Sequence, residues 1–319
     1  MIDMPSFDAV NYAIRPNKNV ERKLVFSSLR ELDRQFDLSG HRYIGLGSVW
    51  FVDFVLAHKS LGIADMLSIE SDPIGHRRAK FNCPLSCIQV LLGDTSAVLP
   101  DIDYQDKPSL LWLDYDSGIG GPALQDIANV LPKLLPGSVF IVTLSAKKDD
   151  LPSQDGAGEP ILLEQALREA AGDLVPPVLP PQRFRKTDYP KLIAEIVSNQ
   201  YQSIALQTRG EKTWVELFEM EYVDSTAMVT VGGFVSTPAT EAQVRMIVAD
   251  GRWRGKQPAP ISLPPLTLKE KIALDRLMPS PAPPTPQQVH RLGFALRQEQ
   301  IAAYHRHYRD YPVFGEVIG

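Results

Sequence analysis

The stretch Tyr43-Ile44-Gly45-Leu46-Gly47-Ser48, followed about 22 residues later by Ile69-Glu70, decides the fold of this chain. A short apolar segment enters the glycine turn, a helix-like run over residues 50–61 leaves it, and the acid ends a second apolar run. Glycines let a backbone approach a ligand, and a carboxylate at the tip of the next strand accepts hydrogen bonds from ribose hydroxyls. The spacing therefore predicts a nucleotide-type pocket in a doubly wound α/β sheet.

Later apolar runs also close on polar residues. Residues 90–92 close on Gly93-Asp94, residues 109–113 close on Asp114-Tyr115-Asp116, and a further apolar run covers residues 138–144. Such runs, with helical stretches between them, are typical of buried parallel strands, whose carboxyl ends bind ligands. For any single acid, a helix N-cap or a solvated loop is the alternative. We expect one site at the strand ends, formed by Gly45, Gly47, Glu70, Asp94, Asp114, Tyr115 and Asp116.

The second half of the core ends differently. Residues 213–222 and 227–234 alternate apolar and polar side chains and are separated by a short connection, which predicts an antiparallel hairpin. Residues 192–206 are mixed, and we expect a helix and then a strand there. The fold class is therefore α/β: a Rossmann-like, mostly parallel sheet with a terminal antiparallel hairpin.

Helical segments flank this core. Pro16 should stop a helix, and a new helix is expected over residues 20–36. Near the other end, Thr267 and Glu270 have capping-box spacing, and a helix is expected over residues 287–309. We divide the chain into an N-terminal helical and basic segment (1–40), a core domain (41–236), and a proline-rich linker with a helical C-terminal appendage (237–319).

Composition limits the class of protein. The chain has 319 residues, 44% hydrophobic and 22% charged, which is enough for a normal core. The net charge of −5 argues against indiscriminate nucleic-acid binding but leaves a local basic patch open. The chain shows no signal-peptide pattern and no run near the roughly 18 apolar residues of a membrane span. We expect a cytoplasmic protein without a membrane partner. Cys83 and Cys87 lack a second ligand pair, so we expect reduced cysteines and no metal.

The ordered motifs resemble the class I S-adenosylmethionine-dependent methyltransferase fold, in which a parallel sheet ends in an antiparallel hairpin. The fuller pattern is similar to a bacterial family of O-methyltransferases. It adds Asn11-Tyr12-x-x-Arg15-x-x-Lys18-x-x-Glu21-Arg22-Lys23 near the start and Tyr311-Pro312-x-Phe314-x-Glu316-Val317 near the end. The resemblance covers most of the chain and implies S-adenosylmethionine as cofactor, with methyl transfer to an oxygen or nitrogen acceptor.

The resemblance also implies roles for single residues. Gly45, Gly47 and Ser48 would lie beside the amino-acid and ribose parts of the cofactor. Glu70 would accept from the ribose hydroxyls and Asp94 would lie near the adenine amino group. Asp114 would face the methionine end, and the catalytic set would be Asp114, Tyr115 and Asp116, the last two directed toward the acceptor. We favour a surface role for Asp53.

The basic residues Arg15, Lys18, Arg22 and Lys23 leave two interpretations open. They could clamp an anionic acceptor, with Arg15 and Lys18 in contact with it, or they could form an ordinary solvated helix start. The acceptor itself is unidentified, with a small molecule, a nucleic acid and a protein all open, and so is a homo-oligomer.

Two rival functions remain. The first is an oxidoreductase that binds NAD or NADP, with Glu70 on the adenosine ribose. The missing third glycine, at Val49, and the terminal hairpin count against it. The second is a non-catalytic protein of the same fold that uses the pocket as a sensor or as a partner surface.

Overall fold

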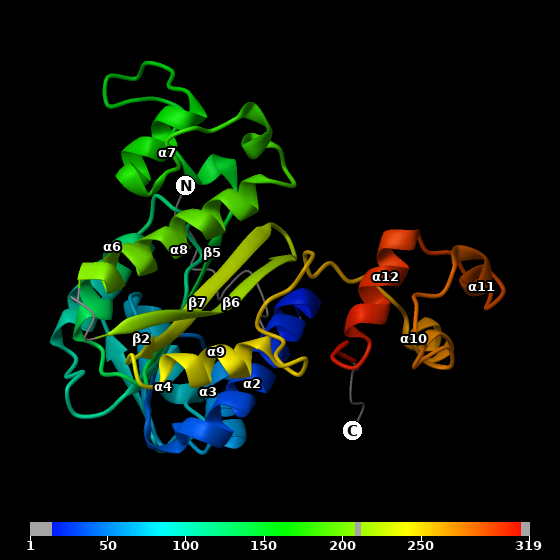
Figure 1. Cartoon of the computed structure of the whole chain (residues 1–319), viewed down its shortest axis with the longest axis horizontal. Helices are drawn as coiled ribbons and strands as arrows, with labels where there is room; N and C mark the ends of the chain where they lie inside the picture. The colour runs from blue at the N-terminus through cyan, green and yellow to red at the C-terminus, as the bar shows by residue number, and fades with distance from the viewer. Residues whose placement is uncertain (1–14, 208–211, 314–319) are drawn as a thin grey trace.

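The computed structural model describes residues 15–207 and 212–313, so the motif residues Asn11, Tyr12, Phe314, Glu316 and Val317 lie outside the described residues. A seven-stranded sheet in the order β3-β2-β1-β4-β5-β7-β6 forms the centre of the molecule (Figure 1). Strands β1 to β5 pair in parallel, and β7 pairs antiparallel with both β5 and β6. The predicted α/β class and the terminal hairpin are therefore confirmed. The strands are β1 (Arg42–Leu46), β2 (Asp65–Glu70), β3 (Ile88–Leu92), β4 (Ser109–Asp114), β5 (Val139–Ser145), β6 (Thr213–Val223) and β7 (Ala227–Ser236).

Helices cover both faces of this sheet, as the apolar character of the strands requires. In β4, Leu110 and Trp112 pack toward α2, α3 and α9, whereas Leu111 and Leu113 pack toward α6, α7 and α8. The helices are α2 (Pro16–Phe36), α3 (Val52–Leu61), α4 (Pro73–Asn82), α5 (Thr95–Val98), α6 (Ala123–Val130), α7 (Leu163–Ala171), α8 (Tyr189–Gln207), α9 (Glu241–Ala249), α10 (Leu268–Asp275), α11 (Pro286–His290) and α12 (Gln298–His307).

Helix α2 begins earlier than the sequence suggested. Pro16 opens this helix, because a proline in the first turn has no amide hydrogen to leave unpaired. Residues 1–14, which would contain the helix expected to stop at Pro16, lie outside the described residues. The carboxylate of Asp224, in the turn between β6 and β7, accepts from the backbone N–H groups of Asn17 and Lys18 at 3.2 and 3.3 Å. Tertiary contacts therefore fix the start of α2 beside the hairpin turn.

Two other helical predictions were wrong. Helix α8 runs without a break to Gln207, so the strand expected within residues 192–206 is absent from this described stretch. The helix expected over residues 287–309 is two helices, α11 and α12. Gly293 lies between them with a φ of 102°, in the left-handed region that ends a helix.

A strap over residues 255–261 runs along β6, the edge strand of the sheet. The N–H of Glu219 donates to the carbonyl of Gly255 at 3.0 Å, and the N–H of Ile261 donates to the carbonyl of Glu221 at 2.8 Å. The N–H of Val223 donates to the carbonyl of Ile261 at 3.1 Å. The strap covers backbone groups that an open edge would expose, and it leads toward the end of β6 that adjoins the hairpin turn.

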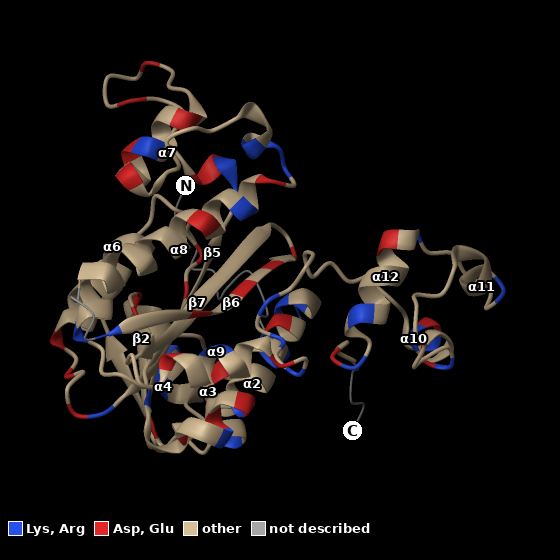
Figure 2. Cartoon of the chain, viewed as in Figure 1, with Lys and Arg blue, Asp and Glu red and all other residues tan. Residues whose placement is uncertain are grey.

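Beyond the strap, residues 266–313 form what we call the C-terminal unit, which lies to one side of the sheet (Figure 1). Helices α10, α11 and α12 enclose a small cluster of buried side chains: Leu274, Val289, Ile301 and Tyr304. The predicted capping box of Thr267 and Glu270 is confirmed at the start of α10. Figure 2 shows acidic and basic residues spread over both this unit and the sheet-bearing body. In the described part of the chain, no helix is long and apolar enough to cross a membrane.

Candidate functional site

A cavity of about 500 Å³ opens at the carboxyl ends of β1, β2 and β4. Of the residues expected at the site, Gly47, Ser48, Glu70, Asp94, Asp114, Tyr115 and Asp116 line it. Gly45, Arg15 and Lys18 are not among its lining residues in the described ranges. The topology explains the grouping, because parallel neighbours in a sheet end at one edge.

The glycine turn shapes the wall between β1 and β2. The N–H of Gly47 donates to the carbonyl of Ile69, and a Cβ at position 47 would lie 2.8 Å from both that oxygen and Cβ of Glu70. At Gly45, a Cβ would meet the rings of Tyr43 and Phe54 at 3.1 and 3.2 Å. Gly47 thus lets the backbone pass β2 closely, whereas Gly45 leaves room for aromatic packing.

Glu70 ends β2 at the cavity wall. Its side chain is largely buried, and its Oε1 accepts from the N–H of Asp72 at 3.1 Å. Burial raises the pKa of the Glu70 carboxyl, against the lowering effect of that backbone hydrogen bond. A carboxylate held in this way at a strand end can accept hydrogen bonds from a ligand in the cavity.

Asp94 and Asp116 are exposed acids on the cavity lining. Asp94 occupies the N-cap position of α5, which was its alternative role, but its side chain makes no capping hydrogen bond. Its carboxylate therefore remains available to the cavity. Asp116 follows β4 by two residues and lies where a ligand in the cavity would meet solvent.

Tyr115 differs from its expected role. Its hydroxyl donates to Oδ2 of the buried Asp126 on α6 at 2.6 Å, and burial raises the pKa of Tyr115 well above its ordinary value. The phenol is thus engaged by the helix packed against β4. This contact fastens the segment after β4 to α6 and does not suit a phenol directed toward the acceptor.

Helix α2 brings Arg22 to the cavity. From the sequence, this residue was expected only to clamp an anionic acceptor or to belong to a solvated helix start. Its Nε lies 2.7 Å from Oδ1 of Asp53 on α3, and both residues line the cavity. The surface role favoured for Asp53 was wrong, since its side chain is only 20% exposed and pairs with a guanidinium. Asp53 and Arg22 thereby join α2 and α3 at the pocket.

Lys18 lies beneath the cavity. Its side chain is 1% exposed, and its Nζ lies 2.8 Å from Oδ2 of Asp114 and 3.0 Å from Oε2 of Glu21. A lysine neutralised by two carboxylates differs from the expected clamp on an anionic acceptor. Arg15, the other residue expected there, is the N-cap of α2.

Glu21 connects this lysine to the middle of the sheet. Its Oε1 accepts from the hydroxyls of Thr230 on β7 and Thr143 on β5. Those two hydroxyls lie 2.8 Å apart, and the indole N–H of Trp112 on β4 donates to Thr143 at 3.0 Å. The chain of hydrogen bonds holds one helix against three neighbouring strands, so the cavity floor is a fixed polar network.

The sequence contained a signal for these inward-facing charges. Lys18, Glu21 and Arg22 continue the same helical stripe as Val25 and Leu29, at spacings of three and four residues. Charged residues in line with an apolar face point to buried, paired groups. The mistaken helix start at residue 20 hid this relation.

Charge is uneven around the cavity. Among the described residues that line it, one is a cation, Arg22, and six are acids: Asp53, Glu70, Asp72, Asp94, Asp114 and Asp116. This surplus of acids favours a ligand that carries positive charge.

Metal ligands do not gather here or elsewhere in the described ranges: no group of three or more His, Cys, Asp and Glu side chains there could hold a metal ion. Cys83 and Cys87 are free thiols.

No curated protein matches the chain. Several solved structures are similar to parts of the chain at low identity. An O-methyltransferase, TomG, from Streptomyces achromogenes, in complex with SAM, has 13% identity, covers 66% of this chain and 79% of its own, and gives a TM-score of 0.38. The structure of a "putative O-methyltransferase" from Klebsiella pneumoniae has 13% identity and coverages of 73% and 96%, with a TM-score of 0.36. The O-methyltransferase from Bacillus cereus, in complex with SAH, has 12% identity and coverages of 66% and 80%, with a TM-score of 0.36.

A family model described as "Putative O-methyltransferase" matches residues 10–319, which is nearly the whole chain. The match includes the helix that carries Lys18 and Arg22, the glycine turn, the strand-end acids and the C-terminal unit. The chain therefore belongs to the "Putative O-methyltransferase" family.

Proposed function

We propose that this chain is an S-adenosylmethionine-dependent methyltransferase that acts on an oxygen acceptor, with nitrogen as the alternative nucleophile. The observation that carries the proposal is the acidic cavity at the strand ends, with Gly47 and Glu70 side by side on its wall. S-adenosylmethionine carries a sulfonium and an ammonium against one carboxylate, so its net positive charge matches the surplus of acids.

The lining residues suit the parts of such a cofactor. Glu70 would accept from the ribose hydroxyls, and the exposed carboxylate of Asp94 would accept from the adenine amino group. At the amino-acid end, Asp114 would receive the ammonium and Arg22 would receive the carboxylate. The side chain of Arg22 is 4% exposed and lies on the cavity wall. Its ion pair with Asp53 already orients the guanidinium.

Bound S-adenosylmethionine supplies an electrophilic methyl group, which an acceptor oxygen can attack. The protein must hold the acceptor in line and take the hydroxyl proton. Asp116 is the cavity acid best placed for this proton, since it is exposed on the lining and lies two residues beyond the end of β4. Tyr115 would act indirectly, by fastening this segment to Asp126.

The oxidoreductase alternative is less well supported. In a classical dinucleotide-binding sheet, a crossover connection follows the fifth strand and places the sixth strand parallel to it. Here β7 enters antiparallel beside β5, and β6 lies outside it.

A ligand panel tests the proposal. We expect S-adenosylmethionine and S-adenosylhomocysteine to raise the unfolding temperature of the protein, and NAD and NADP to leave it unchanged. At 100 times the dissociation constant, a ligand adds about 2.7 kcal/mol to the free energy of unfolding. Stabilisation by NAD or NADP alone would favour the oxidoreductase.

The role of Glu70 can be tested by titration calorimetry. Glu70→Ala should weaken S-adenosylhomocysteine binding by about 1.5–3 kcal/mol, the usual range for hydrogen bonds to a charged group. Glu169→Ala, an exposed change on α7 away from the cavity lining, serves as the control. Equal affinity in folded Glu70→Ala and wild type would refute the ribose contact. If the cofactor binds but mass spectrometry finds no methylated product in a broad acceptor screen, the sensor function becomes the better explanation.

A further inference from the structure

The most unusual group outside the cavity lining is the ammonium of Lys18. It is enclosed by α2 and the sheet, between the carboxylates of Glu21 and Asp114. Two aromatic rings also face it, since Nζ lies 4.9 Å from the ring centre of Trp112 and 5.1 Å from that of Tyr222. Asp114 differs from the other members of this group, because its side chain is 25% exposed and lines the cavity.

We propose that Lys18 is a positioning residue for the amino-acid end of the cofactor: it holds Asp114 from below so that this carboxylate can receive the ammonium group of the ligand. The proposal rests on the proposed function, and it assigns Lys18 a part in cofactor binding without contact to the cofactor. It also replaces the anion clamp on the acceptor with a buried support.

Electrostatics explain why the support must be a cation. Glu21 and Asp114 both approach one Nζ, so their carboxylates lie within about 6 Å of each other. Two carboxylates in such a shared site do not both stay ionised without a counterion. The Lys18 ammonium forms ion pairs with both carboxyl groups, and its Nζ lies 2.8 Å from Oδ2 of Asp114, which fixes the orientation of Asp114.

Stability alone does not account for this arrangement. Replacing a buried ion pair by apolar side chains of similar volume is often neutral or stabilising, because the charges lose their hydration on burial. A position enclosed by Trp112 and Tyr222 could accommodate such a side chain. The charge of Lys18 therefore serves the one partner that reaches the cavity, which is Asp114.

The test compares two ligands that differ only at the amino-acid end. S-adenosylhomocysteine carries the ammonium, whereas 5′-methylthioadenosine retains adenosine and the thioether but lacks the amino acid. In Lys18→Met we expect the affinity for S-adenosylhomocysteine to fall about 10- to 100-fold. The affinity for 5′-methylthioadenosine should change less than about twofold. Lys23→Met is the matched control, an exposed lysine on the same helix whose Nζ donates to the carbonyl of Asp310, and it should alter neither affinity.

A second variant shows whether Lys18 acts through Asp114. Asp114→Asn should give the same ligand-selective loss, and combining it with Lys18→Met should add little further loss, as expected for residues that act as a unit. If Lys18→Met fails to fold, the double variant Lys18→Met, Glu21→Gln removes the unpaired buried carboxylate and carries the same comparison.

Two results would overturn the proposal. Equal losses for both ligands would mean that Lys18 supports the whole pocket, and unchanged S-adenosylhomocysteine affinity would mean that it supports none of it. If the wild-type protein binds neither S-adenosylhomocysteine nor S-adenosylmethionine, the proposed function itself fails, and that outcome is visible before any variant is made.

Discussion

The cavity floor and the C-terminal unit bury polar groups in opposite ways. At the floor, Lys18 forms ion pairs with both Glu21 and Asp114, and the group connects α2 to β4, β5 and β7. In the C-terminal unit, His307 is fully buried and neither ring nitrogen has a hydrogen-bond partner in the described structure. The floor network joins one helix to three strands, whereas the unit encloses a small core of its own.

This difference indicates where ligand chemistry lies. Buried charges lose hydration, and they persist where several partners compensate for that loss. Lys18, Glu21 and Asp114 border the cavity. The loss of their hydration is therefore offset at the place where a charged ligand could add a further ion pair. The C-terminal unit has no comparable set of buried ion pairs among its described residues, and its buried cluster is made of apolar and aromatic side chains.

The largest expected effect concerns the cavity wall. In Gly47→Ala the new Cβ would lie 2.8 Å from a backbone oxygen of β2 and from Cβ of Glu70, a contact that only a shift of β2 or the turn can relieve. Because Glu70 stands at this point, S-adenosylhomocysteine affinity should fall more than about 100-fold. Isothermal titration calorimetry measures the loss.

Gly251→Ala is the matched control, since a Cβ at that position has no heavy atom within 4 Å. It should bind like the wild type. Normal affinity in Gly47→Ala would show that the wall between β1 and β2 is not the ligand site. The buried ion pairs of the cavity floor would then not mark the place where the ligand binds.

The sheet could be predicted from the sequence because burial on both faces leaves a clear pattern. The run over residues 109–113 is almost entirely apolar. In residues 213–222 apolar and polar side chains alternate, because one face of that strand is more polar than the other. The strand-end acids followed from the topology, so Glu70, Asp94, Asp114 and Asp116 were placed correctly on one cavity.

The contacts between distant segments could not be predicted in the same way. Asp53 gave no sign of its partner, because Arg22 lies on another helix. Tyr115 was expected near the acceptor, but the partner that engages it, Asp126, lies in α6. Lys18 is one member of a basic cluster in the sequence, and its place on the apolar stripe of α2, which separates it from the exposed Lys23, was hidden by the mistaken helix start. Side-chain direction depends on tertiary packing that a single sequence does not contain.

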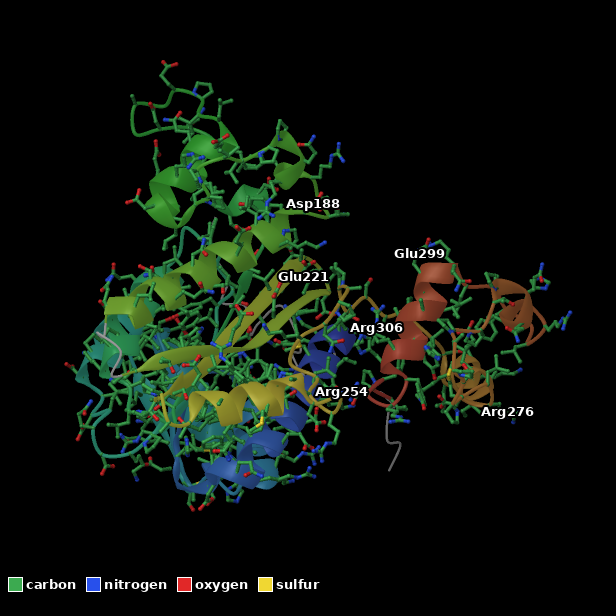
Figure 3. The ribbon with its side chains drawn as sticks, in the orientation of Figure 1. Asp188, Glu221, Arg254, Arg276, Glu299 and Arg306 are labelled. Carbon is green, nitrogen blue, oxygen red and sulfur yellow. The ribbon has the colours of Figure 1, made fainter. Side chains whose placement is uncertain are left out.

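An intermediate effect is expected in the C-terminal unit as pH falls. Burial, assisted by Arg306 and Arg254, lowers the pKa of His307 from 6.5 to about 4. Figure 3 shows Arg254 on the body and Arg306 on α12 at the junction of the two parts. Between these values the unfolded chain binds a proton that the folded chain excludes, so the free energy of unfolding should decrease as pH falls from 6.5 to 4. The slope is at most about 1.4 kcal/mol per pH unit, and the total about 3 kcal/mol.

Hydrogen exchange of the α12 amides measures this local stability. His307→Leu should remove the pH slope, since the leucine fills the buried position without a titrating group. His305→Gln provides the comparison on the same helix, where the ring nitrogen Nε2 contacts the carbonyl of Ser280 at 2.8 Å. If the slope persists in His307→Leu, or disappears in His305→Gln instead, the assignment to His307 is wrong.

The smallest expected effect concerns the attachment between body and C-terminal unit. Nη2 of Arg254 lies 2.6 Å from Oδ2 of Asp310, with side chains 32% and 13% exposed. A partly exposed ion pair of this kind contributes about 0.2–1 kcal/mol, which is far less than the losses expected at the cavity. A double-mutant cycle of Arg254→Ala and Asp310→Ala, followed by hydrogen exchange in α12, should give a coupling in that range that decreases with added salt. S-adenosylhomocysteine affinity should not change in either variant, because neither residue lines the cavity. A parallel loss of ligand affinity would show that the C-terminal unit is coupled to the pocket, and the contrast between the two regions would then be one of degree.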